Sequence, residues 1–557
     1  MAKLTGGEAL VLALAAHGVE TLFGLPGVQN DYFYNALYDF NTGVNAARPT
    51  GGIRLIHTRH EQGAGYMALG YALSTGRAGV YNVVPGPGML NTSAALATAY
   101  ACNAPVLCLT GQIRSDQIGR GFGMLHELPD QLALLRGLTK WAERIRHPAQ
   151  APALVAEAWR QMATGRPRPV ALEVPLDVLA ARAEVDPAAP DLPVLSPPVD
   201  LEAVEDAARL LVEATHPLIF VGGGAQDAAD EVLALAELLQ APVIATYNGR
   251  GVVDSRHYLS HTMPAGHRLW PKADVVLGVG TRLLQPLMNW GVDDRLKVIR
   301  IDVDPEEMGR IVPPTIGLVG RSRPLLAALL AAVEKMVGTR PSRQEEMAAL
   351  RAAVEADFAR LQPQMAFLAA IREALPDDGF FVEEMTQVGY VARFALPIYR
   401  PRTYVSTGYQ GTLGWGFATG LGVKAAHPDR AVLTVSGDGG FLFTASELAT
   451  AVQHRLATVN VVFNDGAYGN VRRMQKTQYG NRIIATDLHN PDFVKLAEAF
   501  GAQGLRAETP DELPAAIRQG LATVDRPTVI EVPVGEMPSP WSLSFAPRVR
   551  PVSQSSP

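Results

Sequence analysis

The sequence predicts an α/β protein of three domains, each a mostly parallel sheet flanked by helices. Short apolar runs rich in β-branched residues alternate with segments of helical spacing, which is typical of βα units. The 557 residues suit about three domains of ordinary size. Residues 180–200 contain five prolines and read as a linker, and a second linker begins near residue 338. We therefore expect domains at residues 1–185, 200–335 and 365–545.

Composition argues against several classes of function. The chain is 48% hydrophobic and 19% charged, and its net charge of −6 gives no electrostatic reason to bind nucleic acid. No segment reaches the roughly 20 consecutive apolar residues of a membrane span. Cys102 and Cys108 lack disulfide or metal-site spacing and are expected to be buried thiols. We expect a cytoplasmic enzyme with neither a nucleic-acid nor a membrane partner.

The C-terminal domain carries the most informative motif. Residues 431–436 form an apolar strand pattern that leads into Gly437-Asp438-Gly439-Gly440, and residues 441–454 then have helical spacing. The next apolar strand, 459–463, is followed by Asp465. Ligands of open parallel sheets gather beyond the carboxyl ends of the strands, so both carboxylates can reach one hard cation, while the glycines admit a phosphate. A single Gly-Asp-Gly turn is as easily an ordinary strand-to-helix connection. The second strand, followed by Asp465 at this spacing, makes that interpretation a poor one.

This paired arrangement resembles the diphosphate-binding motif of thiamin diphosphate enzymes, specifically the acetolactate synthase-like group. The resemblance spans essentially the whole chain and implies the three-domain thiamin diphosphate-binding fold. It implies that Asp438, Asp465 and the carbonyl of Ala467 hold Mg²⁺ against the cofactor. The family usually has Asn where this chain has Asp465, which adds negative charge beside a diphosphate. Further cofactor contacts implied by the resemblance are Gly437, Gly439, Gly440, Tyr468 and, as a weaker match, Gly389.

Glu61 is the leading catalytic candidate. It follows the strand pattern at 54–58 within Arg59-His60-Glu61-Gln62 and by itself could be a plain charge at a helix N-terminus. In the family that it resembles, a Glu in this context binds N1′ of the aminopyrimidine, and a dry pocket would raise its pKa. The carbonyl of Gly411 would accept a hydrogen bond from the 4′-amino group, and Leu413 would be the wedge between the two cofactor rings. The family builds each site from two subunits, so the resemblance implies a dimer as the active unit and a tetramer as the expected homo-oligomer.

The substrate-facing residues are less specific. Counted back from Thr139-Lys140-Trp141, His126 takes the position of a pocket Gln in the benzaldehyde lyase branch, and Gln29 lies where relatives keep a polar residue. His126 could act as a general acid-base near neutral pH, or it could be an ordinary loop residue. By resemblance, the rest of the pocket is formed by Val28, Tyr468, Val471 and Met474.

The resemblance implies a carboligase or decarboxylase that acts on small 2-oxo acids through a C2-ylide and an enamine. One alternative is a C–C lyase of 2-hydroxy ketones or acyl-CoA substrates, of the benzaldehyde lyase or 2-hydroxyacyl-CoA lyase/oxalyl-CoA decarboxylase type. Another is a non-catalytic relative that binds the cofactor. Arg282 is present, but the surrounding block associated with bound FAD is not, so FAD has little support. Glycines 222–224 invite a nucleotide reading of the central domain, although the full fingerprint is absent.

Overall fold

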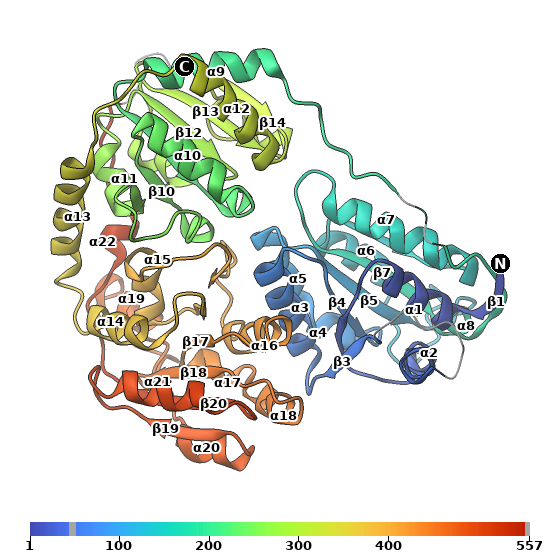
Figure 1. The fold of residues 1–557 in the computed structure, drawn as a ribbon. Coiled ribbons are helices and arrows are strands. Elements are labelled where there is room, and N and C mark those ends of the chain that lie inside the picture. Colours follow the sequence, from blue (N-terminus) through green and yellow to red (C-terminus); the bar gives the residue numbers. More distant parts are fainter. Residues whose placement is uncertain (44–51, 189, 191, 552–557) are drawn as a thin grey trace.

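The computed structural model describes residues 1–43, 52–188, 190 and 192–551. Three six-stranded sheets, each with only parallel pairings, account for most of the strands, and helices flank each sheet (Figure 1). The fold class predicted from the sequence is confirmed. No helix in the described part of the chain is long and apolar enough to cross a bilayer.

The first sheet has the strand order β3-β2-β4-β5-β7-β6. Its strands are β2 (Thr21–Gly24), β3 (Arg54–His57), β4 (Gly79–Val83), β5 (Val106–Gln112), β6 (Trp141–Arg144) and β7 (Val170–Pro175). Its helices are α1 (Gly6–Ala16), α2 (Asp31–Thr42), α3 (Glu61–Thr75), α4 (Pro87–Asn91), α5 (Ser93–Cys102), α6 (Gln131–Leu138), α7 (Ala151–Ala163) and α8 (Leu176–Ala180). A small antiparallel pair, β1 (Ala2–Thr5) with β8 (Arg182–Val185), joins the two ends of this region. The second strand of that pair lies inside the stretch that the sequence analysis took as a linker.

The central sheet has the order β11-β10-β9-β12-β13-β14. Its strands are β9 (Pro217–Val221), β10 (Val243–Ala245), β11 (Ser260–Thr262), β12 (Val275–Val279), β13 (Lys297–Asp302) and β14 (Ile316–Val319). Its helices are α9 (Leu201–Glu213), α10 (Ala229–Leu239), α11 (Met263–Leu269) and α12 (Ser322–Met336), and α13 (Gln344–Phe358) leads to the third sheet.

The third sheet has the order β16-β15-β17-β18-β20-β19. Its strands are β15 (Phe380–Val382), β16 (Tyr404–Val405), β17 (Val432–Gly437), β18 (Val459–Asn464), β19 (Gln503–Arg506) and β20 (Thr528–Pro533). Its helices are α14 (Gln364–Ala374), α15 (Gln387–Ala395), α16 (Gly416–Ala426), α17 (Asp438–Leu442), α18 (Leu448–Gln453), α19 (Gly469–Gln478), α20 (Phe493–Ala499), α21 (Leu513–Ala522) and α22 (Trp541–Ser544). The single helix expected at 441–454 is wrong: α17 begins at Asp438, and a 3-10 turn at 445–447 separates it from α18.

Helices α3 and α16 lie side by side and join the first and third domains (Figure 1). The two backbones are in direct contact, since a Cβ on Gly70 would lie 2.1 Å from the Thr419 carbonyl oxygen and a Cβ on Gly422 would lie 2.0 Å from that of Met67. At Gly70 the partner of α3 is thus another helix, and one hydrophobic core runs through both domains.

The C-terminal segment returns along the molecule to the central domain, where the described chain ends (Figure 1). Trp541 donates from Nε1 to Asn470 on α19 at 2.8 Å. Farther along, the backbone N–H groups of Val549 and Arg550 donate to the carbonyl of Trp290. Through residue 551 the segment is therefore a strap that contacts α19 and the central domain.

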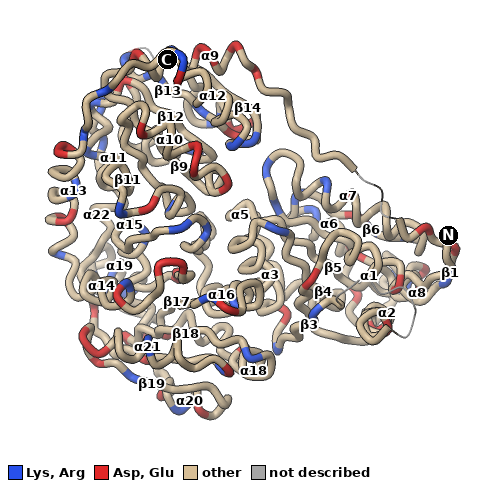
Figure 2. Tube along the Cα trace, in the orientation of Figure 1, with Lys and Arg blue, Asp and Glu red and all other residues tan. Residues whose placement is uncertain are grey.

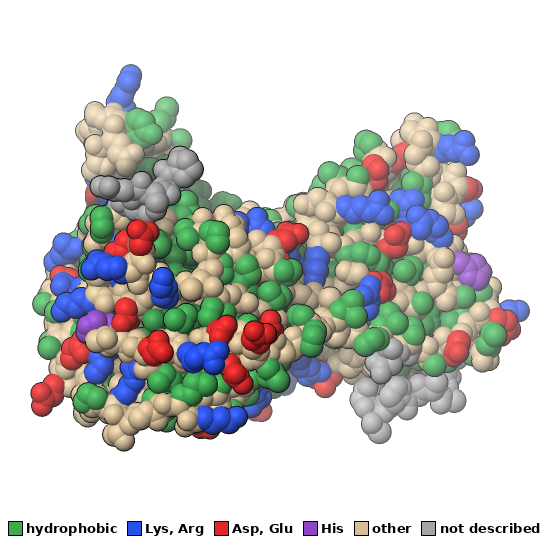
Figure 3. Space-filling model, turned by 90° about the horizontal axis from the view of Figure 1, so that it is seen from above, with side chains coloured by type: hydrophobic (Ala, Val, Ile, Leu, Met, Phe, Trp, Pro, Cys, Tyr) green, Lys and Arg blue, Asp and Glu red, His purple; other side chains and the backbone are tan. Residues whose placement is uncertain are grey.

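Charged side chains of both signs are interspersed along the chain (Figure 2), and the face seen from above mixes them with apolar groups (Figure 3). The face seen in Figure 3 has no broad area of one sign. This distribution agrees with the small net charge of −6.

Candidate functional site

The carboxyl ends of β17 and β18 bring two aspartates together. The strands are adjacent and parallel, with Gly437 paired to Phe463, so Asp438 and Asp465 emerge at the same edge of the sheet. Asp438 is buried, and Asn490 donates from Nδ2 to its Oδ2 at 2.6 Å and to Asn464 Oδ1 at 2.9 Å. Asn490, which the sequence analysis did not single out, therefore closes this cluster from the far side.

The electrostatics of this cluster suit a cation. Burial, and next the charge of Asp438, raise the pKa of Asp465 to about 6. The buried Oδ1 of Asn490 has no partner in the described part of the chain, which leaves one more neutral oxygen ligand. No group of three or more His, Cys, Asp or Glu side chains with metal-site geometry occurs among the described residues. Two carboxylates with amide and carbonyl oxygens fit a hard ion that completes its shell with phosphate oxygens, as Mg²⁺ does.

The turn glycines serve different purposes. A Cβ on Gly439 would lie 2.7 Å from the ring of Tyr468, and one on Gly440 would lie 2.2 Å from Glu384 Oε1. These two glycines are required by packing. A Cβ on Gly437 would meet its neighbours only at ordinary contact distances, so packing does not require a glycine there, and Gly437 is half-buried.

Helix α15 begins beside the aspartates. Gln387 donates from Nε2 to Asp465 Oδ2 at 2.9 Å, and its Oε1 accepts from the backbone N–H of Met537 at 2.7 Å. Gly389 lies beneath, where a Cβ would be 2.2 Å from the carbonyl oxygen of Glu384. Gly389 thus has a packing role here, and the polar contact with the aspartate cluster comes from Gln387.

The segment expected to bend the cofactor lies on a loop next to the first domain. Gly411 is exposed and has φ +59°, a conformation that favours glycine. The hydroxyl of Thr412 is 2.9 Å from that of Thr98 on α5, and Leu413 is half-buried. The loop is therefore anchored at its centre while Gly411 remains accessible.

In the first domain, Glu61 begins α3 and is half-buried. Its Oε2 accepts from Asn91 Nδ2 at 2.9 Å, and a Cβ on Gly88 would lie 3.6 Å from its Oε1. The N-terminus of this helix is held from the third domain, because Glu447 accepts from the backbone N–H groups of Arg59 and His60 at 3.1 and 2.9 Å. The position of Glu61 thus depends on a carboxylate nearly 400 residues away.

His126 and Gln29 form a defined pair. Gln29 donates from Nε2 to the Leu125 carbonyl at 2.9 Å, which turns its Oε1 toward His126 Nδ1, also at 2.9 Å. An amide oxygen only accepts, so Nδ1 carries the proton and Nε2 is the free acceptor of the neutral ring. His126 also has φ +67°, a strained conformation for a residue with a side chain.

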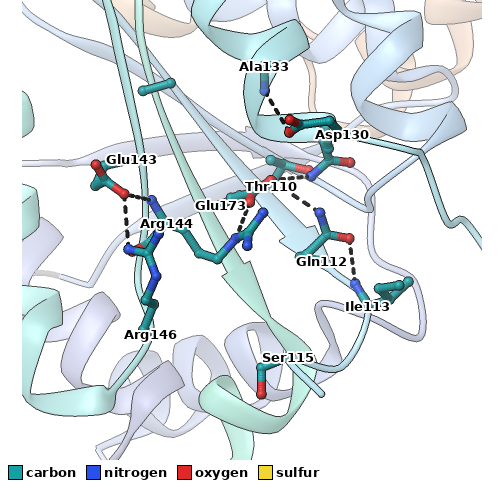
Figure 4. Close-up of polar contacts among 12 residues, drawn as sticks. Thr110, Gln112, Ile113, Ser115, Asp130, Ala133, Glu143, Arg144, Arg146 and Glu173 are labelled. Carbon is teal, nitrogen blue, oxygen red and sulfur yellow. Dashed lines mark hydrogen bonds and ion pairs between the residues drawn. The ribbon is translucent and has the colours of Figure 1, made fainter. Parts of the chain in front are cut away.

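A buried ionic network lies beneath this pair. The fully buried Glu173 binds Arg144 and Gln112, as Figure 4 shows. Gln131 connects Glu173 to the backbone of Gly86. It donates to Glu173 Oε2 at 3.0 Å and accepts from the backbone N–H of Gly86 at 2.9 Å. A Cβ on Gly86 would lie 2.6 Å from the carbonyl oxygen of His126, so this network supports both the loop near Glu61 and the backbone of His126.

The remaining pocket candidates divide between the two domains. Val28 is exposed beside Gln29 in the first domain, whereas Tyr468 precedes α19, and Val471 and Met474 are exposed on that helix in the third. Within the described chain, Glu61 and His126 make no hydrogen bond or ion pair with the aspartate cluster. The structure therefore brings the candidates together as two groups rather than one.

The glycines at the end of β9 have a packing explanation. A Cβ on Gly222 would lie 2.3 Å from the carbonyl oxygen of Gly280, and a Cβ on Gly224 would lie 2.7 Å from the Cα of Gly280. Gly222 and Gly224 let the loops after β9 and β12 touch, and no nucleotide is needed to account for these two glycines.

Comparison with protein families decides the identity of the chain. Residues 4–134, 204–329 and 384–532 match the N-terminal TPP binding domain, the central domain and the C-terminal TPP binding domain of thiamine pyrophosphate enzymes. The chain belongs to the thiamine pyrophosphate enzyme family. It is a thiamin diphosphate-dependent enzyme that forms or cleaves C–C bonds, and the recognition made from the sequence is confirmed.

Curated relatives extend over nearly the whole chain of this thiamin diphosphate enzyme. A probable 2-ketoarginine decarboxylase of Pseudomonas aeruginosa is 36% identical, with 93% of this chain and 92% of the relative covered. A probable acetolactate synthase large subunit of Methanocaldococcus jannaschii is 33% identical, with 95% and 92% covered. The glyoxylate carboligase of Escherichia coli O157:H7 is 30% identical, with 96% and 93% covered. The chain is thus similar to both decarboxylases and carboligases.

Proposed function

We propose that the protein is a Mg²⁺- and thiamin diphosphate-dependent carboligase or decarboxylase of small 2-oxo acids. The observation that carries the proposal is the pair of carboxylates at the ends of β17 and β18, where a buried Asp438 lies near Asp465 beside the half-buried Gly437. Similarity to relatives named as carboligase, synthase and decarboxylase supports the reaction class.

In this proposal Asp438, Asp465 and the Ala467 carbonyl hold Mg²⁺, while Gly437, the turn after it and Tyr468 border the diphosphate. Glu61, Gly411 and Leu413 would hold the aminopyrimidine half. When bound, thiamin diphosphate supplies an electron sink for loss of CO₂ or for C–C cleavage next to a carbonyl. The chain's contribution is to bind and orient these groups and to exclude water.

His126 is the proposed acid-base residue of the substrate pocket. Because Gln29 fixes the proton on Nδ1, Nε2 is the atom that would accept or return a proton. Val28, Val471 and Met474 are exposed apolar side chains that would border the substrate.

We further propose that two copies of the chain complete each site. Glu61 and the aspartate cluster do not contact one another within the described chain. Apolar side chains are exposed beside both groups, as expected of a surface covered by a partner; these are Leu90, Phe122, Leu125, Tyr409 and Phe443. Light scattering during gel filtration tests this point, since a monomeric active enzyme would contradict it. A dimer would satisfy the requirement for two copies at each site. The expected tetramer and the cytoplasmic location stay predictions.

The alternatives receive less support. Thr139 and Lys140, which suggested the lyase branch, have structural roles. Thr139 Oγ1 donates to the Leu135 carbonyl, and Lys140 Nζ donates to the carbonyls of Gln161 in α7 and of Arg166 after it. An acyl-CoA substrate or FAD would call for a nucleotide site in the central domain, where Gly222 and Gly224 are explained by packing. We therefore propose a 2-oxo acid substrate and no flavin, which the visible absorbance of the purified protein checks.

Proton NMR of the protein with thiamin diphosphate, Mg²⁺ and a single 2-oxo acid tests the proposal. Pyruvate is the first substrate, and 2-ketoarginine is the second because of the similarity to a probable 2-ketoarginine decarboxylase. Acetolactate or acetoin from pyruvate would identify a carboligase, and an aldehyde alone would identify a decarboxylase. If bound cofactor were demonstrated but both acids remained unchanged, the 2-oxo acid proposal would be refuted, and hydroxy ketones would be tested next.

A further inference from the structure

Two adjacent glutamates follow β15, and both are fully buried. Glu383 has a cationic partner, with Arg393 Nη2 at 2.6 Å, and it also binds Tyr404 and Ser406. Glu384 makes no ion pair in the described chain, and burial raises its pKa to about 7. Burying a carboxyl group without a cation is costly, so its presence here calls for an explanation.

The contacts of Glu384 connect two segments of the proposed cofactor site. Its Oε1 accepts from the backbone N–H of Gly414 at 2.5 Å, and Gly414 ends the segment that begins at Gly411. Its Oε2 accepts from Ser436 Oγ at 2.8 Å, two residues before Asp438. One carboxyl group therefore spans the segment expected at the pyrimidine half and the turn expected at the diphosphate half.

The surroundings leave this carboxyl group little freedom. A Cβ on Gly416, the first residue of α16, would lie 2.7 Å from Oε2, and one on Gly440, in α17, would lie 2.2 Å from Oε1. Both helices thus begin close to Glu384, and the backbone N–H groups of Gly414 and Gly416 lower its pKa against the larger opposite effect of burial. The two glycines permit this approach, and the approach fixes both helix starts relative to one another.

We propose that Glu384 is a positioning residue that holds the Gly411–Gly414 segment and the β17–α17 turn at the separation required to bind thiamin diphosphate. The inference rests on the cofactor site proposed above. Glu384 does not touch the cofactor in this account; it acts through the backbone of Gly414 and through Ser436. The adjacent Glu383, equally buried but paired with Arg393, is held in a network on the side of β16 and serves as the matched comparison.

The experiment measures the thiamin diphosphate Kd at saturating Mg²⁺, by fluorescence of the buried Trp415 next to Gly414 and by calorimetry. Loss of a hydrogen bond to a charged group corresponds to about tenfold in affinity. We therefore expect Ser436→Ala to raise Kd about tenfold and Glu384→Ala, which loses both bonds, to raise it roughly hundredfold. Glu384→Gln keeps an acceptor for Gly414 and a donor for Ser436 and should restore most of the affinity. Glu383→Gln should lower the urea midpoint but leave Kd near the wild-type value.

Several results would overturn the inference. A folded Glu384→Ala protein with the thiamin diphosphate Kd of the wild type would overturn it. A Glu383→Gln protein whose Kd is raised as much as the Kd of Glu384→Ala would also overturn it. If Glu384→Ala does not fold, Ser436→Ala decides, because a folded protein with unchanged Kd contradicts the proposed link. Hydrogen exchange at residues 409–416 in the absence of cofactor gives a second readout, expected to be faster in Ser436→Ala than in Glu383→Gln. A wild-type protein that binds no thiamin diphosphate would instead refute the cofactor site itself.

Discussion

Replacing Asp465 by Asn is expected to stabilise the metal-free protein. Burial and Asp438 raise the pKa of Asp465 from 3.8 to about 6, so its ionised form is disfavoured in the folded state. At about 1.4 kcal/mol for each pKa unit, a shift of about two units corresponds to roughly 3 kcal/mol. Asp465 is half-buried, and solvent screening reduces this to about 1–2 kcal/mol. An Asn at this position could still accept from Gln387 and could donate to Asp438.

The sign of this effect gives a specific pH dependence. A raised folded-state pKa means that the penalty is absent below about pH 4, where the group is protonated in both states. The penalty grows between about pH 4 and 6 and is complete above about pH 6. The advantage of Asp465→Asn over wild type should therefore be present at neutral pH and disappear in acid.

Thermal unfolding in EDTA across this pH range is the assay. The transition of the C-terminal domain should rise by about 2–4 °C for each kcal/mol at neutral pH. Asp487→Asn is the matched control, because Asp487 is 68% exposed and pairs with Arg472 at 3.3 Å, and its replacement should change the transition little. Saturating Mg²⁺ and thiamin diphosphate should remove the advantage, since the cation neutralises both aspartates. An Asp465→Asn protein that is no more stable than wild type at neutral pH would refute the reasoning. A stability advantage over wild type that is as large at acid pH as at neutral pH would also refute it.

Four further substitutions have clear expected results. Glu61→Gln should reduce kcat by about 10²–10⁴-fold without changing the circular dichroism spectrum, and near wild-type turnover would remove Glu61 from its role. His126→Ala should alter product partitioning or the pH profile of kcat/KM more than the thiamin diphosphate Kd. Gln29→Glu should move the acidic limb of that profile to higher pH, because a carboxylate beside Nδ1 stabilises the imidazolium. If both variants have the pH profile of the wild type, the pair has no role in proton transfer. Arg550→Ala should destabilise the protein by about 1–3 kcal/mol in urea unfolding, because the buried carbonyl of Trp270 loses its guanidinium donor. Asp293 would keep only its ion pair with the exposed Arg295, and proteolysis should then cut the C-terminal strap faster.

Local patterns in the sequence account well for the strands and turns near the aspartates. The buried strands at β17 and β18 are short runs rich in β-branched residues, and parallel pairing places the residues that follow them at one edge. The same patterns misjudged the segment after Asp438, because helical spacing of apolar residues continues across the 3-10 turn that breaks the helix. Periodicity reports which residues face the core and does not show where the backbone hydrogen bonds change.

The residues that hold the site in place were not accessible to such reasoning. Glu384, Asn490 and Glu447 act through partners 26 to 388 positions away in the sequence, and no local spacing reports such contacts. One signal was present, since Glu383-Glu384 directly follows an apolar strand that leads into the core. Two consecutive acids at the end of a buried strand indicate either exposure at the sheet edge or a buried polar network, and the structure shows the second.

The position of Glu447 links the two halves of the proposed site within one chain. The segment that starts with Asp438 reaches Glu447 nine residues later, where the carboxylate binds the N-terminus of the helix that Glu61 begins. A Cβ on Gly63 would lie 2.5 Å from Glu447 Oε1, so this helix fits closely against the carboxylate. A displacement of the Asp438 turn would therefore move the start of α3. If two copies complete each site, the aspartate cluster of one chain belongs to one site and the Glu61 of the same chain belongs to the other. The contact through Glu447 then fixes the positions of the aspartate cluster and Glu61 relative to one another.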